Sequence, residues 1–385
     1  MTAVPSRAIR FHRTGEPLAV LQEERIEIPD PPKNRVRVRV VATGLNPADW
    51  ELCRGFLPGA LPRGIGYDVA GIIDAVGDID AAGVIDAAGG IDAAGVIDVA
   101  GGIDAAGEEE ASDSGGDARQ PASSRTERAG VGNRGGHAGT RNETAGVGAV
   151  VFGTADFIEQ PSAGAADVAL LNNWYRVPAG LDPVQAAALP MVVQTAAWTL
   201  ETMRVEPGAT LLVHGAGGMV GYAAVQIALR LGARVVATAG PTFAADLEQL
   251  GAQVTPYGKG MPDRVRALTG GEDVDLVLDT PRPSPGTMPD LIALAGGDPR
   301  RVMTISNHEE ARRLGARVNL DELRPGLTPL AKLLPEYASL AAEGAFHLPI
   351  VRAYPLEQWR DAVALSLSGN PHGKVMLVPG REAAA

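Results

Sequence analysis

The N-terminal part of the chain alternates apolar and polar positions with the two-residue period that is typical of β-strands. Residues 35–41 place valines on one face and arginines on the other, and residues 69–76 are a second strand candidate. Pro31-Pro32 and the glycines Gly64 and Gly66 separate such runs. Short strands between Gly and Pro turns predict a small β-barrel-like domain.

A different pattern begins near residue 210, where short apolar runs alternate with longer helical segments. Strands are predicted at 210–213, 234–238, 274–279 and 301–305, and a last one at 374–378. Strands that alternate with helices favour a parallel sheet covered on both faces, and hence an α/β fold of the doubly wound Rossmann type. Between the first two strands lie a glycine-rich turn (Gly215, Ala216, Gly217, Gly218, Met219, Val220, Gly221) and an apolar helix.

This strand, turn and helix predict a dinucleotide site. Glycines let the backbone approach a pyrophosphate, and the helix N-terminus offers free N–H groups and a positive dipole end. Glycines placed inside a βαβ unit are much stronger evidence than a glycine triplet alone. The alternative is a tight helix–strand contact with no ligand.

Residues 78–146 are different in kind. Ile-Asp recurs with a six-residue period, at Ile79, Ile85, Ile91, Ile97 and Ile103. A left-handed β-helix is one interpretation, but five copies make fewer than two turns of such a coil, and solenoids need several stacked turns. We favour a flexible acidic insert, because the segment has too few large apolar residues to offset its ordering entropy.

Order resumes at residues 147–152, and a helix is predicted to open at Asp182. Asp182 can cap it, Pro183 suits its first position and Gln185 completes a capping box. We expect Pro190 to kink the helix that follows.

Composition narrows the class of protein. A chain of 385 residues is long enough for two domains. The hydrophobic content is 45%, but no apolar run is long enough to span a membrane and the N-terminus lacks signal-peptide features, so we expect a soluble, cytoplasmic protein. Cys53 is the only cysteine, which excludes an intrachain disulfide. We interpret Cys53 as a small buried side chain.

The net charge of −12 is mostly local. Residues 78–117 hold eleven acidic side chains and no Lys or Arg, and residues 118–146 return +3, so 78–146 sum to −8 and the rest carries about −4. This balance gives no sign of a nucleic-acid-binding or membrane-binding face.

Several motifs in order resemble the medium-chain dehydrogenase/reductase superfamily, in its zinc-free quinone oxidoreductase (zeta-crystallin-like) branch. They lie at residues 44–50, 66–71, 147–153, 186–190, 213–221 and 373–374. The resemblance implies a GroES-like β-barrel catalytic domain formed by residues 1–182 and 326–385, with a Rossmann dinucleotide-binding domain at 183–325. It makes 78–146 an insertion in the catalytic domain. Homodimers through the edge strand of the nucleotide domain are usual in this family.

Zinc alcohol dehydrogenases place a Cys where this chain has Asn46 and a His where it has Tyr67. A catalytic zinc needs three protein ligands, which Asn and Tyr do not ordinarily provide, and the Cys-rich structural lobe is missing. We therefore expect no metal. Hydride addition to an acceptor that delocalises charge suits such a site better than oxidation of a simple alcohol.

The resemblance also implies individual roles. Asn46 and Tyr67 should border the nicotinamide and stabilise negative charge on an acceptor oxygen. Asp49 is a catalytic candidate, or a structural cap of a helix that starts near Trp50. Thr195 lies where relatives contact the nicotinamide, or bonds its own helix backbone. Further cofactor contacts are expected from Thr280, Ser306, Asn307 and Lys374, although a lone lysine is more often solvated. His214, beside the glycine turn, is interpreted as a strand-end residue.

The choice of cofactor rests on the end of the second strand of the βαβ unit. NAD-binding proteins usually carry an Asp or Glu there for the ribose 2′-hydroxyl, and this chain has no acid before Asp246. Relatives that use NADP place a Lys near the position of Ala244. Tyr257 matches a tyrosine that packs near the 2′-phosphate, and Thr238 and Thr242 can donate hydrogen bonds. We expect NADP (as NADPH) to be favoured over NAD.

Three hypotheses follow. The first is an NADPH-dependent oxidoreductase that transfers a hydride to a quinone or an α,β-unsaturated carbonyl compound, a small-molecule substrate. The second is an enoyl-reductase-like or cyclising tailoring enzyme of natural-product biosynthesis. The third is a non-catalytic NADP(H)-binding sensor or structural protein, which would bind the nucleotide and not consume it.

Overall fold

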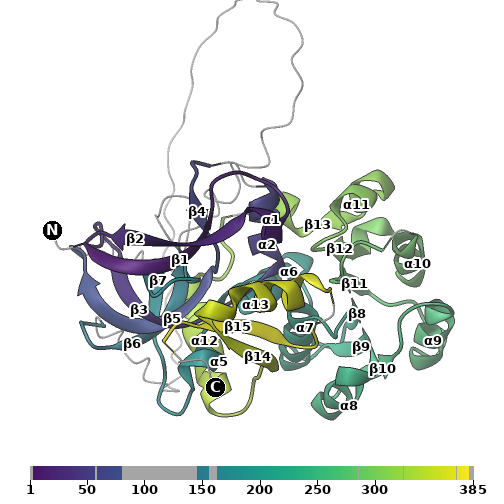
Figure 1. Ribbon diagram of the computed structural model, residues 1–385. Helices are drawn as coiled ribbons and strands as arrows, with labels where there is room; N and C mark the ends of the chain where they lie inside the picture. Colours follow the sequence, from purple (N-terminus) through teal and green to yellow (C-terminus); the bar gives the residue numbers. More distant parts are fainter. Residues whose placement is uncertain are drawn as a thin grey trace, which may run out of the picture.

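The structure is a computed structural model that describes residues 3–56, 59–79, 145–155, 163–284, 286–323, 325–369 and 371–380. Its strands form three sheets. The first is built from the N-terminal part of the chain, the second combines strands from both ends, and the third is built from the middle. Figure 1 shows the third sheet and its helices α8 to α11 at one end of the molecule, and the other two sheets at the opposite end.

The first two sheets form the barrel-like domain. A three-stranded sheet has the order β2-β1-β4, and a six-stranded sheet has the order β14-β15-β3-β5-β6-β7. Strand β3 also pairs with β7, so β3, β5, β6 and β7 close on themselves. Their bounds are β1 Val4–Phe11, β2 Leu21–Ile28, β3 Val36–Gly44, β4 Arg63–Gly64, β5 Asp68–Val76, β6 Val150–Ala155, β7 Val168–Arg176, β14 Ile350–Pro355 and β15 Lys374–Val378. The predicted GroES-like barrel domain is confirmed.

Strand β3 corrects one detail of the expected alternation. Val36, Val38 and Val40 are buried as predicted, but Arg37 is buried as well, at 6% exposure. Its guanidinium donates to Asp74 Oδ1 at 2.9 Å and bonds the carbonyl oxygens of residues 28 and 29. The polar face of this strand is therefore partly covered, and a buried arginine is tolerated there because it is paired.

The middle of the chain forms a six-stranded parallel sheet with the order β10-β9-β8-β11-β12-β13. Its strands are β8 Thr210–His214, β9 Arg234–Thr238, β10 Gln253–Thr255, β11 Leu276–Asp279, β12 Val302–Thr304 and β13 Arg317–Val318. The chain starts at the centre, moves to one edge, and returns to build the other half. This is the Rossmann order, and it confirms the predicted doubly wound sheet.

Helices cover both faces of this sheet. Leu211 and Val213 of β8 pack in one cluster with residues of α6, α7 and α12, while Leu212 packs on the other face with α9, α10 and α11. Because successive side chains of a strand point to opposite faces, a strand buried on both sides reads as a continuous apolar run. This explains why the strands were recognisable from the sequence.

Among the described helices the longest are α6, α12 and α7, with 14, 13 and 12 residues. The described helices are α1 Pro17–Val20, α2 Pro47–Arg54, α5 Pro183–Ala186, α6 Pro190–Met203, α7 Met219–Arg230, α8 Pro241–Leu250, α9 Met261–Leu268, α10 Thr287–Leu294, α11 His308–Leu314, α12 Leu330–Ala342 and α13 Trp359–Leu367. No helix among the described segments combines the length and apolar character that crossing a bilayer requires.

The predictions made at Pro183 and Pro190 have different outcomes: the first is confirmed and the second is wrong. Asp182 caps α5 as predicted, accepting a hydrogen bond from Val184 N at 2.7 Å, with Pro183 at the first turn. The expected kink at Pro190 is wrong, because α5 ends at Ala186 and Pro190 is the first residue of a separate helix, α6. Proline fits that position since the first helical residue needs no N–H donor.

Most of the acidic repeat lies outside the described residues, and so do both interpretations of it. The residues that flank it belong to neighbouring antiparallel strands: β5 pairs with β6 from Asp68 opposite Thr154 to Ile72 opposite Val150. Ile73 N donates to Ala149 O at 3.0 Å, which extends the contact toward the repeat. The repeat therefore joins two adjacent strands.

Candidate functional site

The glycine turn lies at the carboxyl end of β8, and each glycine has a distinct surrounding. Gly215 adopts a left-handed φ of +81°, and a Cβ there would lie 2.6 Å from Pro281 Cδ. A Cβ at Gly221 would lie 2.6 Å from Gly215 O. These two glycines are required for the turn itself.

Gly217 and Gly218 face open space instead. A Cβ at Gly217 would meet only Phe243 at 3.9 Å, and one at Gly218 only Gly215 O at 3.5 Å. The first amide of α7 bonded to the turn is Tyr222 N, which donates to Gly218 O at 2.8 Å, so the N–H groups of Met219 and Val220 precede the helical ladder. Met219 and Val220 are half-buried, and Ala216 is buried. The open glycine face beside these amides is shaped for an anion such as a pyrophosphate.

Thr238 holds the glycine turn in place through a hydrogen bond to Gly215. Its hydroxyl accepts from Gly215 N at 3.0 Å and lies 2.8 Å from His214 Nδ1, and its side chain is fully buried. Burial lowers the pKa of His214 to about 4, so its imidazole is neutral, and Nδ1 and the Thr238 hydroxyl share one hydrogen bond. The hydroxyl of Thr238 is therefore engaged inside the protein and not displayed to a cofactor. His214 is at the strand end, as interpreted.

Loops after β11 and β12 complete this edge of the sheet. The Thr280 hydroxyl lies 2.8 Å from His214 O and 3.0 Å from Gly215 O, and Ser306 Oγ donates to Pro281 O. Asn307 is buried and donates to Glu310 Oε2 at 2.8 Å. These three predicted residues thus gather at the carboxyl end of the parallel strands, where ligands of such sheets bind.

A buried polar cluster lies in the barrel-like domain and joins Asn46, Asp68 and Lys374. Lys374 Nζ lies 2.9 Å from Asp68 Oδ2 and 2.5 Å from Asn46 Oδ1, and Asn46 Nδ2 donates to Asp68 Oδ2 at 3.0 Å. The other oxygen of Asp68 accepts from Met191 N at 2.7 Å, in the first turn of α6. Lys374 is 3% exposed, so it is not the solvated charge that a lone lysine usually is. A contact with cofactor phosphate would require its ammonium to leave this cluster.

Asp49 belongs to the first turn of α2, which begins at Pro47 and not near Trp50 as expected. Its carboxylate accepts from Asn46 N at 2.8 Å and from Gly66 N at 2.7 Å, and the side chain is fully buried. Burial raises the pKa of Asp49 to about 7, against the effect of its two N–H donors. These contacts support the structural interpretation of Asp49.

Tyr67 connects the barrel-like domain to α6. The Tyr67 hydroxyl donates to Gln194 Oε1 at 3.3 Å, and Tyr67 is 5% exposed. Thr195 follows Gln194 and is half-buried on α6, a helix that packs against α7. The Tyr175 hydroxyl is buried and makes no hydrogen bond to a described residue, and burial raises its pKa, with Tyr67 contributing.

The remaining predicted residues lie beyond the end of β9. Thr242 is exposed in the first turn of α8, and its Oγ1 lies 2.9 Å from His372 Nδ1. Tyr257 is 57% exposed, and its ring lies 3.6 Å from the position of a Cβ on Gly240. Because Gly240 is the N-cap of α8, Thr242 and Tyr257 both lie near the N-terminus of this helix.

Asp68, Gln194 and His372 were not predicted as site residues from the sequence. Asp68 lies next to Tyr67 inside a quoted motif, and Gln194 is adjacent to Thr195, so proximity in sequence was an available signal. His372 carried no signal, because only the fold brings it to Thr242, 130 residues away. Cys53 is buried as interpreted, and burial raises the pKa of its thiol to about 12, so it is unreactive.

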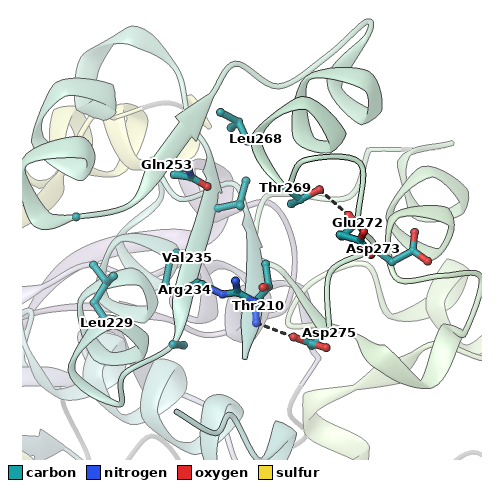
Figure 2. A pocket seen from close by; sticks show the side chains of 13 residues that line it. Thr210, Leu229, Arg234, Val235, Gln253, Leu268, Thr269, Glu272, Asp273 and Asp275 are labelled. Carbon is teal, nitrogen blue, oxygen red and sulfur yellow. Dashed lines mark hydrogen bonds between the residues drawn. The ribbon is translucent and has the colours of Figure 1, made fainter. Parts of the chain in front are cut away.

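A cavity of about 690 Å³ opens at the amino ends of the Rossmann strands, opposite the glycine turn. Figure 2 shows Thr210 and Arg234 at the starts of their strands, with Asp275 bonded to Thr210. Glu272 and Asp273 also line it. Because the cavity lies at the amino ends of the strands and is rich in carboxylates, it does not suit an anionic dinucleotide. The glycine turn at the carboxyl ends of the strands therefore remains the candidate site.

Two family models match the chain. The model described as alcohol dehydrogenase GroES-like domain matches residues 32–118, and the model described as zinc-binding dehydrogenase matches residues 250–377. Within the described residues, no group of three or more His, Cys, Asp or Glu side chains is placed to hold a metal ion.

Individual proteins of two kinds are similar to the chain. The quinone oxidoreductase of Rattus norvegicus is 28% identical over 282 residues, which cover 71% of this chain and 65% of that protein. A hybrid PKS-NRPS synthetase, pyvA, of Aspergillus violaceofuscus is 43% identical over 103 residues, or 25% of this chain and 3% of that protein. The chain spans only 3% to 9% of the length of the first four curated relatives it matches.

A solved structure has the same fold. The quinone oxidoreductase of Escherichia coli, complexed with NADPH, superimposes with a TM-score of 0.67 at 21% identity, covering 97% of this chain and all of that one.

Proposed function

We propose that this chain, which belongs to the medium-chain dehydrogenase/reductase superfamily, is an NADPH-dependent oxidoreductase that reduces a quinone or an α,β-unsaturated carbonyl compound without zinc. The observation that carries the proposal is the open glycine face at Gly217 and Gly218, joined through α7 and α6 to the buried hydroxyl of Tyr67. An oxidoreductase of this superfamily needs a polar group beside the acceptor and a surface that binds the dinucleotide. We call this surface the cradle; it consists of Gly217, Gly218 and the first amides of α7.

The cradle fits the pyrophosphate of a nicotinamide dinucleotide. Side chains at Gly217 or Gly218 would fill the space that phosphate oxygens need, and the leading amides of α7 provide donors. The bound cofactor supplies the hydride. The protein positions it, with Thr280 and Thr238 holding the carbonyl and amide of Gly215 in place.

The donor set in the catalytic domain does not fit a zinc ion. The Asn46 carboxamide is hydrogen-bonded to both Asp68 and Lys374, and the Lys374 ammonium already places a positive charge 2.5 Å from Asn46 Oδ1. A second cation there would be repelled, and neither a thiolate nor an imidazole is at hand among these residues. No step of the reaction is therefore assigned to a metal.

Tyr67 is the residue we assign to the acceptor. Its hydroxyl can turn from Gln194 to an acceptor oxygen, where it stabilises the negative charge that grows as the hydride arrives. For a quinone, one hydride and one proton give the hydroquinone. For an enone, the hydride adds to the β-carbon and the proton to the α-carbon. A conjugated acceptor delocalises the charge, which is why one phenol donor is sufficient in place of a Lewis acid.

The preference for NADPH follows from the residues at the end of β9. No acid lies between Thr238 and Ala245, so nothing in that segment repels a 2′-phosphate. Thr242 and Tyr257 lie on the surface where the adenosine ribose is expected. A homodimer through the exposed edge of the Rossmann sheet is part of the same proposal.

A second candidate function is the reduction of an enoyl thioester during polyketide assembly. It is favoured by the similarity to parts of several polyketide synthases, including 39% identity over 110 residues with the erythronolide synthase EryA2 of Saccharopolyspora erythraea, 27% of this chain and 3% of that protein. The hydride chemistry is the same, and the candidates differ only in the acceptor.

An acceptor panel separates these possibilities. NADPH consumption is measured with 1,4-benzoquinone, an enone and a crotonyl thioester, for the wild type and for Tyr67→Phe. We expect Tyr67→Phe to lower kcat about 100-fold with an unchanged Kd for NADPH. Tyr337→Phe, at a buried tyrosine of α12, is the matched control and should not change kcat. Full activity in Tyr67→Phe would remove Tyr67 from the mechanism.

A further inference from the structure

Thr242 and His372 form a contact between the Rossmann domain and the C-terminal segment of the chain. Thr242 is in the first turn of α8, and His372 precedes β15 of the barrel-like domain. Thr242 Oγ1 and His372 Nδ1 are 2.9 Å apart, and both residues are exposed. An imidazole from the barrel-like domain is thereby held beyond the end of β9.

This place is where a Rossmann fold receives the adenosine ribose. The ribose of a dinucleotide lies at the carboxyl end of the second strand, which is β9 here. Tyr257 borders the same surface, since its exposed ring lies within 3.6 Å of a Cβ on Gly240. Ala239 N donates to Thr255 O at 3.1 Å, which keeps the segments after β9 and β10 together. His372 and Tyr257 thus approach one ribose position from two segments.

The charges of these segments suit an anion. Residues 238–245, 255–260 and 369–376 contain no Asp or Glu, whereas they contain Lys259, His372 and Lys374. Arg264 donates to Thr255 Oγ1 and to the carbonyl oxygens of Pro256 and Lys259, so its guanidinium lies beside the second segment. Lys374 is paired with Asp68, whereas His372 contacts α8 and can offer an N–H donor to a ligand there.

We propose that His372 recognises the 2′-phosphate of the cofactor and is positioned for this by Thr242. The assignment deepens the proposed function and rests on it. The imidazole donates an N–H to a phosphate oxygen, and Thr242 holds the ring in place through Nδ1. A cofactor without the 2′-phosphate lacks this contact, so His372 determines the preference between NADPH and NADH.

The test measures binding of two fragments that differ only in this group. Calorimetry gives the Kd of 2′,5′-ADP and of 5′-AMP for the full-length wild type, His372→Ala, His372→Lys and Thr242→Val. His12→Ala is the matched control, because His12 is another exposed histidine, paired with Glu24 in the barrel-like domain. The Kd values for NADPH and NADH are measured in the same series.

We expect the wild type to prefer 2′,5′-ADP, and His372→Ala to reduce this preference about tenfold, as loss of a hydrogen bond to a charged group requires. His372→Lys should retain it, and His12→Ala should match the wild type. A wild-type preference that survives His372→Ala overturns the assignment of His372 and leaves the proposed function intact. Equal loss of affinity for both fragments also overturns it, since that result marks a structural role. A wild type that binds neither NADPH nor NADH contradicts the proposed function itself.

Discussion

The ammonium group of Lys374 lies 2.9 Å from Asp68 Oδ2, and neither side chain is more than 3% exposed. The same aspartate bonds the Asn46 amide and the first turn of α6 at Met191 N. Four elements therefore meet at one carboxylate: β5, β15, α2 and α6. Because α6 leads into the Rossmann domain, this junction sets the position of the acceptor side of the site relative to the glycine turn.

Lys374→Met is predicted to destabilise the protein by about 3–5 kcal/mol, because it leaves the Asp68 carboxylate buried without its cation. The measurement is the free energy of unfolding in urea. Combining it with Asp68→Asn, which removes the second charge, should recover part of the loss. A single variant as stable as the wild type would show that the ion pair does not support the junction.

Gly218→Val is predicted to abolish cofactor binding without loss of stability. Gly218 has an ordinary extended conformation, and a Cβ there points into open space, so the side chain occupies the phosphate position and strains nothing. Gly146→Val, another open glycine without a left-handed φ, is the control. Fluorescence titration with NADPH and a thermal melt check both parts. Unchanged NADPH affinity in Gly218→Val would contradict the assignment of the cradle.

Asp49 is predicted to make stability dependent on pH. Its folded pKa of about 7 is above the value of about 4 in an unfolded chain, so its contribution is complete below pH 4 and is lost as the pH rises through 7. Relative to Asp49→Asn, which cannot ionise, the wild type should lose at most about 4 kcal/mol between pH 4 and 8. Urea unfolding at several pH values gives the difference. A constant difference would mean that Asp49 is ionised throughout.

Deletion of residues 80–144 is predicted to preserve folding and most activity, provided that a short turn joins Ile79 to Ala145. The strands on either side, β5 and β6, are antiparallel neighbours, which a short hairpin can connect. Soluble yield and the thermal melting temperature measure the outcome. A collapse of soluble yield would favour the interpretation in which the Ile-Asp repeats pack as a structural element.

The Rossmann sheet was largely predictable because its signals are local. Strand β9 occupies residues 234–238, as predicted, and β8 extends the predicted 210–213 by one residue, since buried parallel strands appear as continuous apolar runs. The helix start at Pro190 was missed, because a proline within an apolar run can either kink a helix or begin one, and tertiary packing decides.

The site was harder to predict than the fold, because its contacts join distant parts of the chain. Lys374 was expected at solvent or at a phosphate, and only the pairing of β15 with β3 brings it to Asp68. Thr238 was expected to face the cofactor, but the last residue of a strand can point to either side, and here it bonds His214. His372 was missed for the same reason, since its neighbour Thr242 belongs to the other domain.

The most direct test of the central claim is an anaerobic titration of the purified protein with NADPH and with NADH, followed by addition of 1,4-benzoquinone while the absorbance of the reduced nicotinamide is recorded. We predict saturable binding that is tighter for NADPH, and decay of the absorbance once the quinone is added. Binding without decay for the quinone, the enone and the thioester would contradict the reductase assignment and favour a sensor or structural protein. Absence of binding by either nucleotide would contradict the glycine cradle itself.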